Sequence, residues 1–139
     1  MHDTGRKNKG KIFGLILIMK DKKTLILGAS ENPERYSYLA LNRLKKANHS
    51  VYAIGKRKGS LNGIEIHKEH VQFNDVDTVT LYLNPSNQKS YYDYILSLNP
   101  KRIIFNPGTE NKELQDLASK KGIEVLEACT MVLLSTGQY

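Results

Sequence analysis

The stretch Thr24-Leu25-Ile26-Leu27-Gly28-Ala29-Ser30 decides the fold class, because it reads as a buried strand that ends at a glycine turn. An unbroken apolar or β-branched run of this length is typical of a strand in a parallel sheet that is covered on both faces. The next segment, residues 35–47, predicts an amphipathic helix, since its small and apolar residues recur every three or four positions. These residues are Ala40, Leu41, Leu44 and Ala47.

The same alternation of strand and helix continues along the chain. Short apolar or β-branched runs predict further strands at residues 51–54, 77–83, 101–105 and 123–126. Amphipathic, capped stretches predict helices at residues 86–98 and 111–121. Asn62-Gly63 predicts a turn that leads into a minor strand at residues 64–66. We therefore expect an α/β domain of three layers, with a parallel sheet of about five strands and helices on both faces.

Residues 1–21 differ in composition from the rest of the 139-residue chain. A basic start precedes the apolar run Ile12–Met19, whose eight residues are too few for a membrane span of about 20. No small-x-small cleavage site follows this run, so a secretory signal is disfavoured. We expect a leader or extension over residues 1–21, outside the native fold if Met19 is the true start, and one domain over residues 22–139. The alternative for this segment is an added strand or helix that packs on a neighbour.

The basic charge of the chain is concentrated near its start. The formal net charge is +7 at pH 7, of which +5 lies in residues 1–23 and +2 in residues 24–139. A domain so nearly balanced does not favour a nucleic-acid partner. The single cysteine, Cys129, excludes an internal disulfide and a cysteine-based metal site and indicates a reducing compartment. We therefore expect a cytoplasmic protein.

The turns that follow the predicted strands hold the candidate site, because ligands of parallel α/β sheets bind at the carboxyl ends of the strands. These turns are residues 28–37, 55–60, 84–87 and 106–109. All four are rich in Gly, Pro, Asn or Ser.

The first turn places Gly28 at a strand end just before a helix, where backbone N–H groups and the helix dipole favour a phosphate. Arg35, at the start of that helix, is placed to pair with the phosphate bidentately. The further glycines of G-x-G-x-x-G are absent and no G-x-x-x-x-G-K-[ST] occurs, so neither a nicotinamide site nor a P-loop is supported. The competing interpretation is plain turn chemistry, with Arg35 as a solvated surface charge.

The second turn contains the run Lys56-Arg57-Lys58. The end of the second strand is where nucleotide-binding sheets meet the adenosine ribose, and basic residues there suit a phosphorylated ribose. Three cations on a glycine-flanked loop are also compatible with ordinary solvated surface. Because the run lies at the predicted ribose end of the site, we weigh a phosphorylated adenosine ligand equally with a solvated surface loop.

Several motifs of the chain together resemble one known family. They are Gly28-Ala29-Ser30 with Asn32–Ser37, Val79–Pro85, Phe105–Glu110, Glu127–Thr130 and Thr136–Gln138. In this order they resemble the stand-alone CoA-binding domain proteins, relatives of the N-terminal domain of the succinyl-CoA synthetase alpha subunit. The resemblance covers residues 22–139 and implies a Rossmann-like fold.

The resemblance implies a CoA or acyl-CoA ligand that extends over the turns. The first turn would hold the CoA phosphates with Ser30, Glu31, Asn32, Pro33 and Arg35. The ribose phosphate would meet Lys58, with Lys56 close by. The adenine or pantetheine path would be lined by Asn84, Pro85, Phe105, Asn106 and Pro107. One departure from the ligase pattern is that Glu31 and Glu34 replace a glycine-rich phosphate turn, which puts two acids beside the polyphosphate.

Catalytic machinery is sparse in the sequence. No Ser/His/Asp arrangement has a supporting spacing, and the ligase's second domain is absent, so synthetase activity is not implied. His67, Glu69 and His70 do not follow H-E-x-x-H, which favours a solvated charged loop over a metal site. The leading function is a CoA- or acyl-CoA-binding module with no nucleic-acid or membrane partner. A small enzyme that acts on an acyl-CoA, and a protein-interaction domain with a vestigial nucleotide cleft, are the alternatives.

Overall fold

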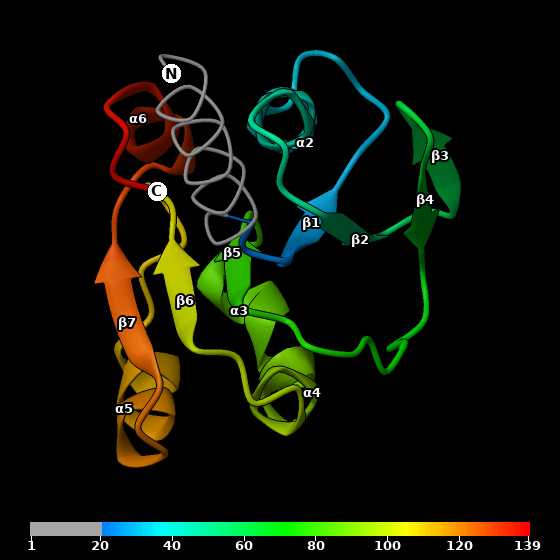
Figure 1. Ribbon diagram of the computed structural model, residues 1–139. Helices are drawn as coiled ribbons and strands as arrows, with labels where there is room; N and C mark the ends of the chain where they lie inside the picture. Colours follow the sequence, from blue (N-terminus) through cyan, green and yellow to red (C-terminus); the bar gives the residue numbers. More distant parts are fainter. Residues whose placement is uncertain (1–20) are drawn as a thin grey trace, which may run out of the picture.

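The strands of residues 21–139, which the computed structural model describes, form one sheet with helices on both faces (Figure 1). The strands are Thr24–Ala29 (β1), Val51–Gly55 (β2), Gly59–Leu61 (β3), Ile64–His67 (β4), Thr78–Leu81 (β5), Arg102–Phe105 (β6) and Glu124–Glu127 (β7). The helices are Tyr36–Lys46 (α2), Pro85–Gln88 (α3), Tyr92–Ser97 (α4), Lys112–Lys120 (α5) and Thr130–Ser135 (α6), with a 3₁₀ turn at Lys89–Tyr91.

The strand order is β3-β4-β2-β1-β5-β6-β7, with β1 at the centre. The pairs β1–β2, β1–β5, β2–β4, β5–β6 and β6–β7 are parallel, whereas β3 runs antiparallel to β4. The three-layer α/β class predicted from the sequence is therefore confirmed. The sheet has seven strands, more than the expected five or so, because a hairpin after β2 adds β3 and β4, of which β3 is antiparallel.

The β3–β4 hairpin turns at Asn62-Gly63, as its sequence predicts. Both residues have positive φ, 52° at Asn62 and 79° at Gly63, which two-residue hairpin turns require and which these two residue types tolerate. The strand after the turn is a full member of the sheet, because Ile66 pairs with Ala53 of β2 and is 1% exposed. Burial of this one apolar side chain makes β4 more than the expected minor strand.

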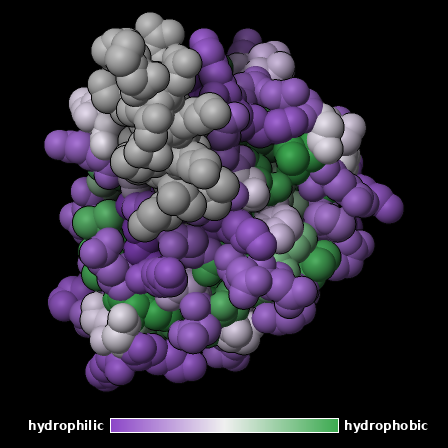
Figure 2. Space-filling view, in the orientation of Figure 1, coloured by the Kyte–Doolittle hydropathy of each residue, from purple (hydrophilic) through white to green (hydrophobic). Residues whose placement is uncertain are grey.

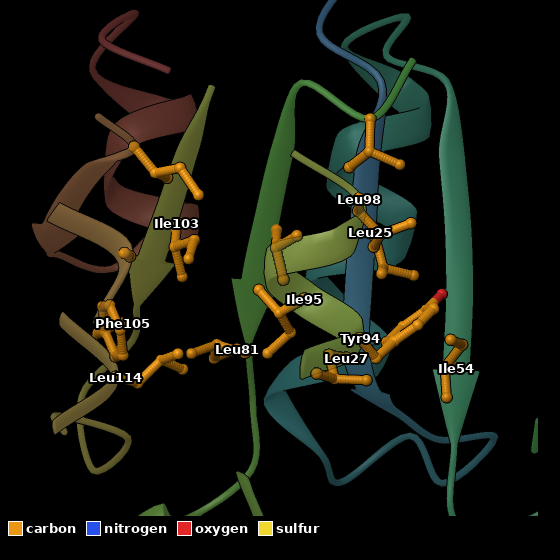
Figure 3. Close-up of a cluster of buried hydrophobic side chains, with 14 residues drawn as sticks. Leu25, Leu27, Ile54, Leu81, Tyr94, Ile95, Leu98, Ile103, Phe105 and Leu114 are labelled. Carbon is orange, nitrogen blue, oxygen red and sulfur yellow. The ribbon is translucent and has the colours of Figure 1, made fainter. Parts of the chain in front are cut away.

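The core has one apolar layer on each face of the sheet. One layer packs Leu25, Leu27 and Phe105 against α4 and α5 (Figure 3). The other packs Ile26 and Ile104 against α2 and α6. Alternating strand residues thus serve opposite layers, which is the arrangement expected when both faces of a parallel sheet are covered.

The helix predicted at residues 86–98 is divided into α3, the 3₁₀ turn and α4. Gln88 is fully buried, and its side chain donates to the carbonyl oxygens of Leu83 and Thr109 at 2.8 Å each. Tyr94 and Ile95 bury the following segment against the sheet. Between Gln88 and Tyr94 the backbone forms the 3₁₀ turn Lys89–Tyr91. The prediction of one continuous amphipathic helix is therefore wrong.

Of the predicted leader, only Asp21 is described; residues 1–20 lie outside the described residues. The Asp21 carboxylate accepts hydrogen bonds from the backbone N–H and the hydroxyl of Ser50, at 2.8 and 2.9 Å. None of the helices within residues 21–139 is long and apolar enough to cross a membrane. Hydrophilic residues cover most of the described surface seen in Figure 2, with smaller hydrophobic patches between them.

Candidate functional site

The candidate site lies where the chain changes direction across the sheet. From β1 the chain builds β2, β4 and β3 on one side, and it then returns to the other side of β1 to form β5. The carboxyl ends of β1 and β5 therefore flank the switch point at which open α/β sheets bind their ligands.

Two glycines let the backbone pass closely at this point. Gly28 has a φ of +104°, and a Cβ added to it would lie 3.0 Å from the carbonyl carbon of Tyr82 at the end of β5. A Cβ on Gly55, the last residue of β2, would lie only 2.3 Å from the carbonyl oxygen of Ala29. The loop after β1 thus crosses the end of β2 with no room for a larger residue.

The first turn is held by its own side chains. The Ser30 hydroxyl accepts from the Asn32 N–H, and Asn32 Oδ1 accepts from the Glu34 N–H, both at 3.0 Å. These bonds lead the chain into α2, whose N-cap residue, Arg35, has an extended backbone and makes no capping bond with its side chain. Residues 31–36, which include Arg35, are exposed, whereas Ser37 is buried.

The amino end of α2 offers unused donors to this turn. The N–H groups of Tyr36 and Ser37 have no acceptor within residues 21–139. The first N–H groups of a helix carry a partial positive charge, and α2 is 11 residues long. An anion placed against the first turn would therefore be stabilised by the helix and by Arg35 together.

The side chain of Glu31 extends from the first turn to the β3–β4 hairpin. Its Oε2 accepts a hydrogen bond from the N–H of Ser60 in β3 at 3.1 Å. A Cβ on Gly59 would lie 2.6 Å from the same carboxylate, so the glycine makes room for it. The turn after β1 and the loop after β2 are thereby joined directly.

The basic loop Lys56-Arg57-Lys58 connects β2 to β3 and is exposed. Gly59 and Ser60, assigned to this loop from the sequence, belong to β3. None of the ion pairs formed within the described residues uses the three cations. Backbone hydrogen bonds lower the pKa of Glu69, and the nearby charge of Lys58 lowers it further. The loop thus presents positive charge to solvent.

The third turn begins α3. Asn84 accepts a hydrogen bond from the N–H of Asn87 at 3.0 Å and is the N-cap, and Pro85 is the first helical residue. Both are exposed, as is Pro107 in the fourth turn. These three residues have free surface at the carboxyl edge of the sheet.

Phe105 and Asn106 are placed differently from their predicted role. Phe105 has no exposed surface and packs in the core, so its side chain is not available to a ligand. Asn106 is 3% exposed, and its amide donates to Thr80 Oγ1 and to the Leu81 carbonyl oxygen at 2.7 and 2.8 Å. Its Oδ1 accepts from the N–H of Thr130 at 2.9 Å. The side chain of Asn106 is therefore committed to internal contacts.

A known protein family matches most of the chain. Residues 22–135 match the family of the CoA binding domain. The chain belongs to this family. The family match confirms the resemblance to CoA-binding domain proteins that the sequence motifs indicated. No curated protein matches the chain.

Solved structures share the fold of this CoA-binding domain. A crystal structure of an uncharacterized protein is 54% identical, with a TM-score of 0.84, and the match covers 86% of this chain and 98% of that chain. A hypothetical protein from Pyrococcus horikoshii OT3 is 23% identical, with a TM-score of 0.76 and coverage of 91% and 89%. A cell-free protein, ID.343 from Thermus thermophilus, is 17% identical, with a TM-score of 0.76 and coverage of 89% and 95%. The last two show the fold alone.

Sequence reasoning missed a polar row on β5 of the CoA-binding domain. Thr78 and Thr80 are fully buried, and Tyr82 continues their spacing at the switch point. Burial raises the pKa of Tyr82 to about 12, so its phenol stays protonated near neutral pH. Cys129, the half-buried N-cap residue of α6, lies nearby. The alternation of polar residues at positions 78, 80 and 82 was the available signal.

Proposed function

We propose that this chain binds CoA or an acyl-CoA at the carboxyl edge of its sheet and acts as a binding module. The observation that carries the proposal is the amino end of α2, where free N–H groups and Arg35 adjoin a glycine crossing at the switch point. Membership of the CoA binding domain family supports CoA as the ligand.

The residues present fit a polyphosphate in the first turn. Within residues 21–139 the N–H groups of Tyr36 and Ser37 have no acceptor, so they would donate to phosphate oxygens, and Arg35 adds a charge. Ser30 and Asn32 fix the shape of the turn that leads into α2 by their internal hydrogen bonds. We assign the diphosphate of CoA to this position.

With the diphosphate in the first turn, we can assign the surroundings of the phosphorylated ribose and of the adenine or pantetheine path. Lys58 and Lys56 lie on the loop after β2, where they would meet the phosphorylated ribose. Asn84, Pro85 and Pro107 have the exposed surface to line the adenine or pantetheine path. The side chains of Phe105 and Asn106 take no part in our assignment, because they are buried.

The chemistry around the switch point supports binding rather than catalysis. A general base needs a pKa near the working pH. Tyr82 is a half-buried titratable group there; burial raises its pKa to about 12, so its phenol stays protonated at neutral pH and is a poor base. We therefore assign no catalytic residue to this chain.

The decisive experiment compares CoA with dephospho-CoA, which lacks only the 3′-phosphate. A charge-assisted contact contributes about 1.5–3 kcal/mol, so calorimetric titration should show a preference for CoA of about tenfold to a hundredfold. Lys58→Ala should remove most of this preference and change dephospho-CoA binding little. Added salt should weaken it, because the loop is exposed.

Lys120→Ala is the matched control, since Lys120 is an exposed lysine at the end of α5, at the opposite edge of the sheet. This variant should keep the wild-type preference. Equal affinity of the wild-type protein for both ligands would overturn the assignment of the basic loop. Absence of binding to both ligands would overturn the proposed function. Native mass spectrometry of protein purified from cells gives an independent answer, through a retained mass of CoA or an acyl-CoA.

A further inference from the structure

Glu31 occupies an unexpected place for an acid beside a phosphate site. Its carboxylate accepts the N–H of Ser60 at 3.1 Å, across 29 residues of sequence. It makes no hydrogen bond to the free N–H groups at the start of α2. The negative charge is therefore tied to the hairpin, which leaves the helix end available to an anion.

The contact depends on two glycines. The loop after β1 reaches the hairpin by crossing the end of β2, where Gly55 leaves space for the Ala29 carbonyl. It then meets the backbone of Gly59, where a Cβ would lie 2.6 Å from Oε1 and from Cδ of Glu31. Figure 1 shows this loop running from β1 toward the β3–β4 hairpin.

The contact also lies on β3, the edge strand that directly follows the basic loop. β3 is an edge strand of three residues, and it pairs only with β4 within the described sheet. Its other edge has no strand neighbour, so the Ser60 N–H would face solvent without Glu31. Because Lys58 is bonded covalently to Gly59, whatever holds β3 in place also holds the basic loop.

We infer that Glu31 is a positioning residue that sets the preference for a 3′-phosphorylated ribose by holding the Lys56–Lys58 loop beside the first turn. The inference rests on the proposed function. It assigns to Glu31 a role different from phosphate contact, since a carboxylate repels phosphate but accepts a backbone N–H. The hydrogen bond, and not the negative charge, is the feature that matters.

The test separates the hydrogen bond from the charge. Glu31→Gln keeps a carbonyl oxygen for the Ser60 N–H and removes the charge, whereas Glu31→Ala removes both. Glu34→Ala is the matched control, because it removes an exposed acid from the same turn, and the hydrogen bond made at Glu34 uses its backbone N–H. The ratio of CoA to dephospho-CoA affinity is measured by calorimetry for each variant, after its melting temperature confirms folding.

We expect Glu31→Ala to lower this ratio at least threefold, and Glu31→Gln and Glu34→Ala to keep the wild-type ratio. Gly59→Ala, which displaces the carboxylate without changing any charge, should lower the ratio as well. Amide hydrogen exchange at Ser60 should quicken in Glu31→Ala and stay slow in Glu31→Gln, a readout that needs no ligand.

Three results would overturn the inference: an unchanged ratio in Glu31→Ala, an equal fall in Glu31→Gln, or an equal fall in Glu34→Ala. If Glu31→Ala raises the affinity for both ligands and leaves the ratio unchanged, Glu31 acts only by repelling phosphate. If the wild-type protein prefers CoA while Glu31→Ala keeps that preference, this inference fails and the proposed function stands. If the wild type binds neither ligand, both fail.

Discussion

At the scale of single residues, His49 shows how a polar group is accommodated at the end of the sheet opposite the candidate site. Its Nδ1 accepts the backbone N–H of Lys22 at 2.9 Å, and its ring packs edge-on against Tyr139 with centroids 4.9 Å apart. Burial lowers the pKa of His49 from its ordinary value of 6.5. The carboxylate of Asp21, 3.9 Å away, opposes this shift, and the charges of Lys22 and Arg102 reinforce it.

The lowered pKa predicts that His49 destabilises the fold in acid. Since the unfolded chain binds this proton more readily than the folded protein, the free energy of unfolding falls as the pH drops below 6.5 toward the lower folded pKa. His49→Asn, which retains an acceptor for Lys22, should lose less stability between pH 7.5 and pH 5.5 than the wild type. Urea denaturation at the two pH values measures this, with exposed His70→Asn as the control. A pH dependence as steep in His49→Asn as in the wild type would contradict it.

At the scale of elements, α6 is attached to the sheet by a side chain far from it in sequence. Cys129, the N-cap residue of α6, makes no capping bond with its side chain. Asn106, at the end of β6, supplies the missing acceptor to the Thr130 N–H and also bonds β5 through the Leu81 carbonyl. One carboxamide thereby ties two strands and a helix.

Asn106→Ala should therefore destabilise the fold markedly. It leaves the Thr130 N–H and the Leu81 carbonyl oxygen without this partner in a buried region, at about 1–3 kcal/mol for each group. We expect a loss of about 2–4 kcal/mol in the free energy of unfolding, measured by urea denaturation. Asn84→Ala, which removes only an exposed helix cap, should lose about 1 kcal/mol. Equal losses in the two variants would show that the buried network contributes little.

At the scale of the whole molecule, the family match and the described core coincide. The match spans residues 22–135, and the two apolar layers are built between Leu25 and Tyr139. Residues 1–18 precede the family match and lie outside the described residues. The domain boundary near residue 21 stays a prediction from composition.

A chain that starts at Met19 should fold with little loss of stability and keep its ligand affinity, because the family match begins after it. Differential scanning calorimetry should give a melting temperature within a few degrees of that of the full chain, the shift expected for about 1 kcal/mol in a domain of this size. A decrease of more than about 10 °C would mean that residues 1–18 contribute to the core.

Local patterns were enough to predict the fold class, most strands and helices, and the turns of the candidate site. The apolar run at Leu25–Leu27, the Asn62-Gly63 turn and the helix after Asn111 each depend on neighbours in the sequence, so they could be read without coordinates. The motifs at the strand ends likewise indicated the CoA-binding domain family. Spacing alone did not show that residues 86–98 divide, because the division follows from the buried Gln88.

Only the tertiary structure decided which of these residues meet. The approach of Gly28 to Tyr82, the bond from Glu31 to Ser60 and the commitment of Asn106 to α6 join residues 24 to 54 positions apart. The burial of Phe105, which removes it from the ligand path, depends on packing in the cluster that it shares with Leu114 of α5 (Figure 3). Such contacts are set by strand order and by the crossing of loops over strand ends, and no pattern of neighbouring residues encodes them.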